Sequence, residues 1–334
     1  MSIFMIGTQR SGSNLLRLML NQAENLVSPH PVHILKRMTP LLPFYGDLED
    51  CNNFRQLVDD VCNIVKLNPV PWEGVELDPD KIINACTKNS LTTVYEAVYD
   101  DFAKANKASN WCCKSLNNVQ FIPEISSHFK QAKFIHLYRD GRDVALSFRK
   151  AIVGEKHFYF IAKQWHKDQQ LALRIKDDTQ RYFGVRYESL INQPEEILKS
   201  LCEFLGIKYN SDMLNFNQSR EAERTANGGA LWSNVSKPLM KSNTEKFRKQ
   251  ASEEDLRIFE SVAGTTLDAL GYERALIKKS QAIKFTDNDI RQFSAENERL
   301  KAETRNKLSP EDKLKRDIQE NYLKKIKERV NRWC

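Results

Sequence analysis

The sequence predicts an α/β fold of three layers, with helices on both faces of a mainly parallel sheet and a helical extension at the C-terminus. Short apolar segments of strand character alternate along the chain with amphipathic helical segments, which is the pattern of parallel α/β proteins. The first apolar segment leads directly into a glycine-bearing turn and then a helix. Hydrophobic residues make up 41% of the 334 residues, which is enough for a large core and excludes general disorder.

Strands are expected where apolar residues are continuous, and helices where they recur every three or four positions. Strands are predicted at residues 3–6, 133–138 and 182–187, and the apolar stretch 111–113 is predicted to end a fourth. Helices are predicted near residues 15–20, 90–106, 143–150, 158–176 and 194–205. The last of these begins at Pro194 and ends at Gly206, as is common at helix ends.

The composition divides the chain into residues 1–277 and residues 278–334. The first part is the predicted α/β domain, and its last helix begins at a capping box, Ser252 to Asp255, and ends at Gly271. The second part is highly charged and lacks glycine, and its apolar residues recur at helical spacing: Leu314, Ile318, Tyr322, Ile326, Val330 and Trp333. This amphipathic helix must cover its apolar side against the domain, a second copy of the chain or another partner.

Charge and cysteine content narrow the class of protein. The net charge of +7 suits an anionic ligand, but the charges are spread along the chain, so nucleic-acid binding is not predicted. The seven cysteines form no Cys-x-x-Cys pair, which indicates free thiols in a reducing compartment. The first seven residues lack the basic start of a signal peptide, and no apolar run approaches the about 18 residues of a membrane span. We therefore expect a cytoplasmic protein without a transmembrane segment.

Residues 7–14 form the first predicted anion site. A strand that ends in a glycine-bearing turn before a helix places several backbone N–H groups and the helix N-terminus around one anion. Arg10 adds a full positive charge there, and three side-chain donors follow it: Ser11, Ser13 and Asn14. The spacing from Gly7 to Gly12 is that of a P-loop, but no Lys follows Gly12 and Asn14 stands where a hydroxyl would hold Mg²⁺. The turn therefore predicts an anion site that does not require a magnesium nucleotide.

A second anion site is predicted after the strand at 133–138. Arg139 follows that strand directly, at the sheet edge where open α/β sheets bind ligands. Ser147 lies about two helical turns further on. The alternative for Arg139 is an ion pair with Asp140 or Asp143, and the alternative for Ser147 is an ordinary polar helix position.

Together these residues resemble the sulfotransferases that use 3′-phosphoadenosine 5′-phosphosulfate (PAPS), in particular the bacterial and tyrosylprotein-type enzymes. The run Gln-Arg-Ser-Gly-Ser-Asn-Leu-Leu at 9–16 is similar to the family's 5′-phosphosulfate loop. Arg139 and Ser147 keep the spacing of the family pair that holds the 3′-phosphate. The resemblance extends from residue 1 to about residue 273. It implies a P-loop-like fold and transfer of a sulfuryl group from PAPS to an acceptor hydroxyl or amine, with PAP as the product and no metal required.

The resemblance also implies the residues that bind PAPS. Tyr187 lies in a segment similar to the one where a family tyrosine approaches the nucleotide. A Lys-Pro pair at 237–238 precedes Lys246 by the nine residues that separate such a pair from a PAPS-contacting lysine in the tyrosylprotein-type enzymes. The implied set is Gln9, Arg10, Ser11, Gly12, Ser13, Asn14, Arg139, Ser147, Tyr187, Ser236, Lys237 and Lys246.

The catalytic candidates are two histidines, one lysine and Arg10. Histidine suits a general base because its ordinary pKa is near neutral, and the run Pro29-His-Pro-Val-His33 supplies two. His30 aligns with the glutamate of the family's Pro-Glu-Pro pattern, so His30 is preferred and His33 is the reserve. Lys114 resembles a family lysine that steadies the transferring sulfonate, although the family's following proline is absent. Arg10 and the loop amides would stabilise the leaving phosphate.

Two other functions remain open at the level of sequence. One is a P-loop kinase that uses ATP, against which the missing Gly-Lys-Ser/Thr run argues. The other is a non-catalytic nucleotide-binding protein whose C-terminal helix docks a partner. The sequence does not identify the acceptor, which could be a small molecule, a lipid or a carbohydrate. It also leaves open whether the C-terminal helix forms a homo-oligomer.

Overall fold

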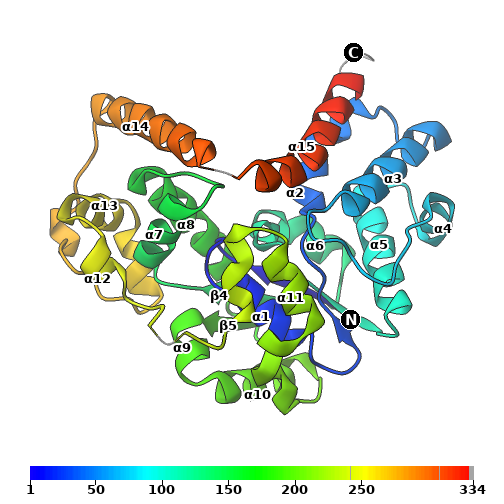
Figure 1. Ribbon diagram of the computed structural model, residues 1–334, viewed down its shortest axis with the longest axis horizontal. Coiled ribbons are helices and arrows are strands. Elements are labelled where there is room, and N and C mark those ends of the chain that lie inside the picture. Colours follow the sequence, from blue (N-terminus) through cyan, green and yellow to red (C-terminus); the bar gives the residue numbers. More distant parts are fainter. Residues whose placement is uncertain (241, 308, 331–334) are drawn as a thin grey trace.

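The computed structural model describes residues 1–240, 242–307 and 309–330. Within these residues, five strands form one parallel sheet in the order β2-β3-β1-β4-β5. The strands are β1 (Ser2–Ile6), β2 (Leu26–Val27), β3 (Asn110–Cys113), β4 (Lys133–Tyr138) and β5 (Tyr182–Arg186). Figure 1 shows helices on both sides of this sheet, so the predicted fold class is confirmed. Strand β2 was not predicted, because two residues carry no periodic pattern.

Alternate residues of the central strand face different helical layers. Phe4 and Ile6 of β1 belong to a buried cluster that includes α5 (Leu91–Ala105) and α6 (Ile122–His128). Ile3 and Met5 belong to a second cluster with α1 (Ser13–Leu20) and α10 (Pro194–Leu205). Since side chains along a strand alternate between faces, the continuous apolar run of β1 satisfies both layers.

The predicted helices are present, and the structure adds shorter ones. A third buried cluster joins α7 (Gly141–Lys150), α8 (Phe158–Leu173) and α13 (Glu253–Ala269). Helix α13 begins at the predicted capping box, in which the Asp255 backbone N–H donates to Ser252 Oγ at 3.1 Å. The α-helices before the C-terminal part that the sequence did not predict are α2 (Ile34–Met38), α3 (Cys51–Lys66), α4 (Pro79–Ala85), α6 (Ile122–His128), α9 (Tyr187–Asn192), α11 (Arg220–Asn227) and α12 (Phe247–Gln250). The 3₁₀ helices are η1 (Thr39–Phe44), η2 (Leu116–Phe121), η3 (Ser211–Gln218), η4 (Ala230–Ser236) and η5 (Lys279–Gln281).

The first helix of the C-terminal part, α14 (Asp287–Asn306), packs beside α7 and α8 (Figure 1). Asn297 Oδ1 accepts hydrogen bonds from the backbone N–H groups of Lys156 and His157, at 2.8 and 3.0 Å. The His157 ring stacks on Phe293 with 4.4 Å between ring centroids. Helix α14 therefore supports the residues that begin α8.

The second helix of the C-terminal part, α15 (Pro310–Val330), lies against α3 (Figure 1). Ile326 is fully buried in the first cluster, and the Tyr322 hydroxyl donates to the buried carboxylate of Asp60 at 2.8 Å. Leu314 and Ile318, at the other end of the helix, are exposed. Trp333 and the side chain of Val330 lie outside the described residues. Of the three possible partners for this helix, the structure thus shows contacts with its own chain.

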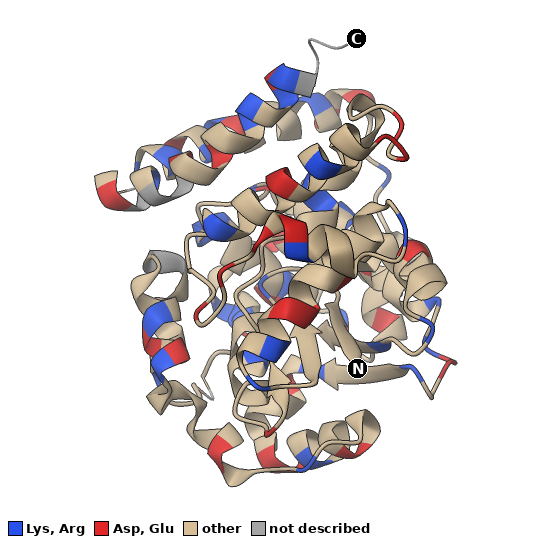
Figure 2. Ribbon diagram, turned by 90° about the vertical axis from the view of Figure 1, so that its right-hand side faces the viewer, with Lys and Arg blue, Asp and Glu red and all other residues tan. Residues whose placement is uncertain are grey.

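Three further features bear on the class of protein. Six cysteines are free thiols in the part of the chain that the structure describes, and Cys334 lies outside it. Over the same residues, no helix combines the length and apolarity that crossing a membrane requires. On the face that Figure 2 shows, basic and acidic residues are intermixed along the helices rather than gathered into one basic area.

We expect the substitution Ile326→Ala to lower the free energy of unfolding by about 2–5 kcal/mol, because it leaves a cavity in a filled core. Leu314→Ala, on the same helix but 65% exposed, should change it by no more than about 0.5 kcal/mol. Urea denaturation of both variants measures the difference. Equal and small effects would show that α15 does not pack on the domain in solution.

Candidate functional site

The residues that follow each strand meet at one edge of the sheet. All strands are parallel, so their carboxyl ends lie together. Gly7 follows β1, Lys114 follows β3, Arg139 follows β4 and Tyr187 follows β5. The segment with both candidate histidines, residues 28–33, follows β2. The topology therefore brings the predicted binding and catalytic residues to a common edge.

The loop at 7–14 is held closely on two sides. Gly7 has a φ of 131°, and a Cβ there would lie 2.4 Å from the Leu137 carbonyl oxygen of β4. Gly12 has a φ of 94°, and a Cβ there would lie 2.4 Å from the Tyr187 ring. Only glycine fits both positions. The Ser11 hydroxyl donates to the Thr8 carbonyl at 2.7 Å and closes the turn.

Two guanidinium groups converge beside this loop. Arg10, with a left-handed φ of 72°, donates from Nε to Ser147 Oγ at 3.0 Å. Arg139 is 5% exposed and donates to the Arg10 carbonyl at 3.3 Å. Burial and the nearby Arg139 lower the pKa of Arg10. The two predicted anion sites are thus neighbours, and their positive charges act on each other.

Tyr187 and the unpredicted Asn243 complete the wall around Arg139. The Arg139 guanidinium lies 4.6 Å from the centre of the Tyr187 ring. Asn243 accepts from Arg139 through its backbone oxygen at 2.7 Å and donates from its side chain to the Tyr187 hydroxyl at 2.6 Å. A single asparagine in a loop has no distinctive sequence pattern. The only signal was the spacing of Lys237 and Lys246 on either side of it.

The other late-loop candidates have no polar link to this centre. Ser236 and Lys237 are exposed at the end of η4, and Ser236 Oγ donates locally to the Ser233 carbonyl at 3.2 Å. Lys246 is half-buried and directly precedes Phe247, whose N–H donates to Asp143 at 2.9 Å. Among the described residues, no hydrogen bond or ion pair joins Ser236, Lys237 or Lys246 to the loop at 7–14 or to Arg139.

Lys114 is a buried cation beside the same loop. It is 9% exposed, and burial, Arg17 and Arg10 lower its pKa well below the ordinary value. Gln9 Nε2 donates to Asn117 Oδ1 at 2.9 Å, which joins the loop to the segment after Lys114. Within the described ranges, neither Lys114 nor Arg10 forms an ion pair with a carboxylate. Cations removed from water without a counter-charge are costly, so the site has the electrostatics of an anion receptor.

Two loop side chains behave differently. Ser13 is half-buried at the first position of α1, next to the helix N-terminus. The Asn14 side-chain oxygen is buried and, among the described residues, has no hydrogen-bond partner. A buried amide that lacks a partner is available to a ligand at this position.

His33 lies in the electric field of Lys114. It precedes α2 with a left-handed φ of 60°, a conformation that is unfavourable for a residue with a side chain and is common at functional sites. Burial, Lys114, Arg37 and Lys36 lower its pKa well below 6.5. Its Nδ1 is buried, and the described part of the chain offers it no hydrogen-bond partner. His33 is therefore neutral at neutral pH.

The surroundings of His30 fix which of its ring nitrogens carries the proton. Asn68 Nδ2 donates to the Val70 carbonyl at 2.7 Å, which identifies that atom as the amide nitrogen, and it lies 3.2 Å from His30 Nδ1. His30 Nδ1 must then accept, so Nε2 carries the ring proton. The Trp72 indole donates to the His30 carbonyl at 2.7 Å. The resting form of His30 is a donor at Nε2 rather than a base.

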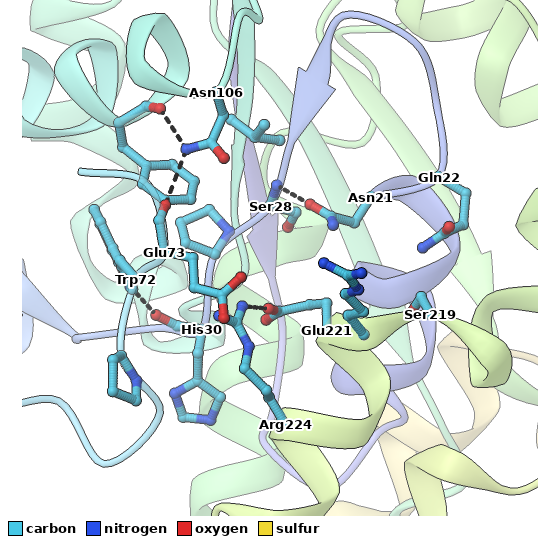
Figure 3. A pocket seen from close by; sticks show the side chains of 15 residues that line it. Asn21, Gln22, Ser28, His30, Trp72, Glu73, Asn106, Ser219, Glu221 and Arg224 are labelled. Atoms are coloured by element: carbon cyan, nitrogen blue, oxygen red, sulfur yellow. Dashed lines mark hydrogen bonds and ion pairs between the residues drawn. The ribbon is translucent and has the colours of Figure 1, made fainter.

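A cavity of about 250 Å³ lies beside His30 (Figure 3). In its wall, Glu221 pairs with Arg224, and Arg224 pairs with Glu73. Behind the wall, Arg17 donates to Glu221 at 2.6 Å and extends this chain of ion pairs. Arg17 is fully buried and also donates to the Ser28 carbonyl at 2.9 Å. The sequence did not single out this network, because its members come from three separate segments.

The chain is similar to known proteins over more than half of its length. Residues 2–211 match the model of the sulfotransferase family. A putative protein-tyrosine sulfotransferase of Caenorhabditis briggsae is 27% identical over 195 residues, which covers 56% of this chain and 68% of that protein. One of the same name from Caenorhabditis elegans is 27% identical over 195 residues and is covered to 74%.

Two solved structures share the fold. The sulfotransferase domain from the Synechococcus PCC 7002 olefin synthase superposes with a TM-score of 0.53 and 21% identity, covering 81% of this chain and 94% of that domain. The sulfotransferase domain from the curacin biosynthetic pathway gives a TM-score of 0.51 and 21% identity, covering 82% and 98%. At this identity the likeness concerns the fold.

We expect Gly12→Ala to destabilise the protein more than Gly206→Ala does. Both glycines have a positive φ, which costs an alanine about 1–2 kcal/mol, but a Cβ at Gly206 meets nothing within 4 Å. At Gly12 the added Cβ must also displace the Tyr187 ring, for a further penalty of about 1–3 kcal/mol. Urea denaturation gives both values. Equal losses would mean that Tyr187 does not press on the loop.

Proposed function

The chain belongs to the sulfotransferase family, as its motifs predicted, and we propose that it transfers the sulfuryl group of PAPS to an acceptor hydroxyl or amine. One observation carries the choice of donor. Arg10 and Lys114 are cations withdrawn from water without carboxylate partners in the described residues, and Arg139 lies beside Arg10. PAPS carries negative groups at two points of its ribose and would neutralise this cluster.

The residues present fit such a donor. The loop N–H groups, including that of Ser11, and the N-terminus of α1 would hold the 5′-phosphosulfate, with Gln9, Ser13 and Asn14 as side-chain donors. Arg139 and Ser147 would hold the 3′-phosphate, and Tyr187 would lie against the nucleotide beside them. Ser236, Lys237 and Lys246 remain proposed contacts on the family resemblance alone. Arg10 lies between the two phosphate positions, because its side chain reaches Ser147 while its backbone belongs to the loop.

The chemistry that PAPS supplies is a sulfuryl group on a good leaving group. Lys114 would donate to the oxygen that links sulfate to phosphate, and Arg10 would stabilise the charge that develops on the leaving phosphate. Both side chains are already desolvated, so their charges act at low effective dielectric and need little rearrangement. The protein provides these cations itself.

For the general base, the geometry favours His33 over His30. His33 is neutral and lies near Lys114, where we place the sulfonate. His30 needs a change of tautomer before its Nε2 can accept a proton, because Asn68 donates to Nδ1. The left-handed backbone of His33 costs stability, and residues strained in this way cluster at functional sites. We therefore place His33 first and keep His30 as the second candidate.

The cavity beside His30 bears on the class of acceptor. The cavity beside His30 has a mainly polar wall (Figure 3), which is compatible with a small-molecule or carbohydrate acceptor. A lipid acceptor is less well matched.

Free cysteines support a cytoplasmic location. An ATP kinase would need a lysine after Gly12, and release of phosphate from ATP with magnesium would revive it. A nucleotide-binding protein without activity would bind PAP and transfer nothing.

Arg139→Ala should weaken PAP binding by about 2–3 kcal/mol, because it removes a charged donor to the 3′-phosphate. Adenosine 5′-phosphosulfate, which lacks that phosphate, should bind the variant almost as it binds the wild type. Isothermal titration with both ligands tests this, with Arg149→Ala as the control on α7, the helix after Arg139, since Arg149 pairs with Asp255 instead. If both ligands weaken equally, Arg139 has a structural role only.

His33→Asn should lower turnover by about 10²–10⁴-fold while PAP affinity is kept, and His30→Asn should have a smaller effect. The wild-type rate should fall only below pH 6.5, since a base must be deprotonated and the pKa of His33 is lowered. Transfer of labelled sulfate from PAPS to a panel of small, carbohydrate and lipid acceptors provides the assay. Full activity of His33→Asn would mean that His33 is not the general base, and His30 would then be the candidate.

A further inference from the structure

A buried carboxylate lies beneath the donor loop and has no role in the proposed chemistry. Asp168 of α8 is 2% exposed. It accepts from Gln164 at 2.7 Å, from the Thr8 hydroxyl at 3.2 Å and from Gln120 at 3.5 Å. All three donors are neutral, and over the described ranges Asp168 forms no ion pair. A buried carboxylate without a counter-charge lowers the stability of the fold, and groups of this kind are common at functional sites.

Asp168 terminates a chain of hydrogen bonds that can run in one direction only. Gln169 Nε2 donates to Thr8 Oγ1 at 3.1 Å, so the amide oxygen of Gln169 faces His136 Nε2 at 2.6 Å. His136 Nε2 must therefore donate, and its Nδ1 accepts from the Tyr182 hydroxyl at 2.7 Å. The Thr8 hydroxyl, which already accepts from Gln169, gives its single proton to Asp168. The Asp168 carboxylate is therefore the final acceptor of this chain of hydrogen bonds.

The chain of bonds ends on the first side chain of the loop. Thr8 follows Gly7, which lies so close to β4 that a Cβ there would meet the Leu137 carbonyl oxygen at 2.4 Å. The Thr8 carbonyl accepts from Ser11, so Thr8 is fixed through both its side chain and its backbone. Loss of the Asp168 acceptor would free the hydroxyl and loosen the start of the loop.

The groups around Asp168 determine the pKa of its carboxyl. Lys167 on its own helix lowers the pKa of the carboxyl. Burial and Arg37 lower the pKa of Lys36 of α2, and Asp168 lies close enough to oppose that shift in part. The loop contributes Arg10 further along, η2 contributes the neutral Gln120, and β4 contributes His136, which burial keeps neutral with a pKa of about 4. Burial outweighs the hydrogen bonds and raises the pKa of Asp168 to about 6.

We propose that Asp168 is a positioning residue of the donor loop, which holds Thr8 in place and takes up a proton from solvent when a polyanion binds to the loop. The inference rests on the proposed function for the identity of the polyanion. A ligand with several negative charges disfavours the nearby carboxylate. The neutral acid still offers an oxygen to Thr8, and its new O–H can donate to Gln164 or Gln120, whose amides can turn their oxygen toward it.

The first test needs no ligand. Asp168 has a higher pKa folded than the roughly 3.9 of an unfolded aspartate. Between about pH 4 and pH 6 the folded state binds the extra proton, so the contribution of Asp168 to wild-type stability, measured against a variant without the carboxyl, should fall as pH rises through this window. Asp168→Asn should lack this fall, while Asp177→Asn, on the exposed surface after α8, should keep it. Identical pH profiles for the wild type and Asp168→Asn would overturn the proposal.

The second test is titration calorimetry with PAP at pH 7 in two buffers of different ionisation enthalpy. The wild type and Asp177→Asn should take up a fraction of a proton on binding, and Asp168→Asn should take up less. Asp168→Ala should bind PAP roughly fivefold more weakly, since Thr8 loses its acceptor. Equal proton uptake in all proteins, or unchanged affinity in Asp168→Ala, would overturn the proposal. Absence of PAP binding to the wild type would instead refute the proposed donor, and the stability profile would then decide the role of Asp168.

Discussion

A cluster of positive charge at the carboxyl edge of the sheet is the constraint that organises this protein. Arg139 has Asp143 as a partner at 3.5 Å, whereas Arg10 and Lys114 have no carboxylate partner among the described residues. Arg10, Lys114 and Arg139 come from three strand ends, and each is at least partly withdrawn from water. Mutual repulsion and desolvation lower the pKa of Arg10 and Lys114. A fold can keep such a cluster only if packing holds the side chains in place and a ligand supplies the opposite charge.

The packing that holds this cluster comes from distant parts of the chain. The loop is held by β4 on one side, by Tyr187 on the other and by α8 from below through Thr8. Helix α8 itself begins at residues whose backbone N–H groups are bound by Asn297 of α14. Helix α14 thus belongs to the support of the site, although it contributes no side chain to it among the described residues.

The two histidines after β2 illustrate how environment assigns roles. They are three residues apart, and sequence reasoning preferred His30 on its alignment with a family glutamate. Asn68, 38 residues further on, donates to His30 Nδ1 and so leaves the proton on Nε2. Burial, and next to it Lys114 from another strand end, keeps His33 neutral. Neither effect is visible without the tertiary structure, because both depend on partners that are remote in sequence.

The sequence by itself determined the strand–turn–helix units, the strand ends at which the cations lie and the family, since these depend on local periodicity and on motifs of fixed spacing. The predicted strands and helices are present in the structure, but the two-residue β2 and several helices, among them the 16-residue α3, were not predicted. Only the tertiary structure decided that Asn243 bonds to both Arg139 and Tyr187, that Asp168 supports Thr8, and that Ile326 packs on the domain. Those contacts join segments up to hundreds of residues apart, and their energies arise from burial and charge, which one-dimensional spacing does not encode.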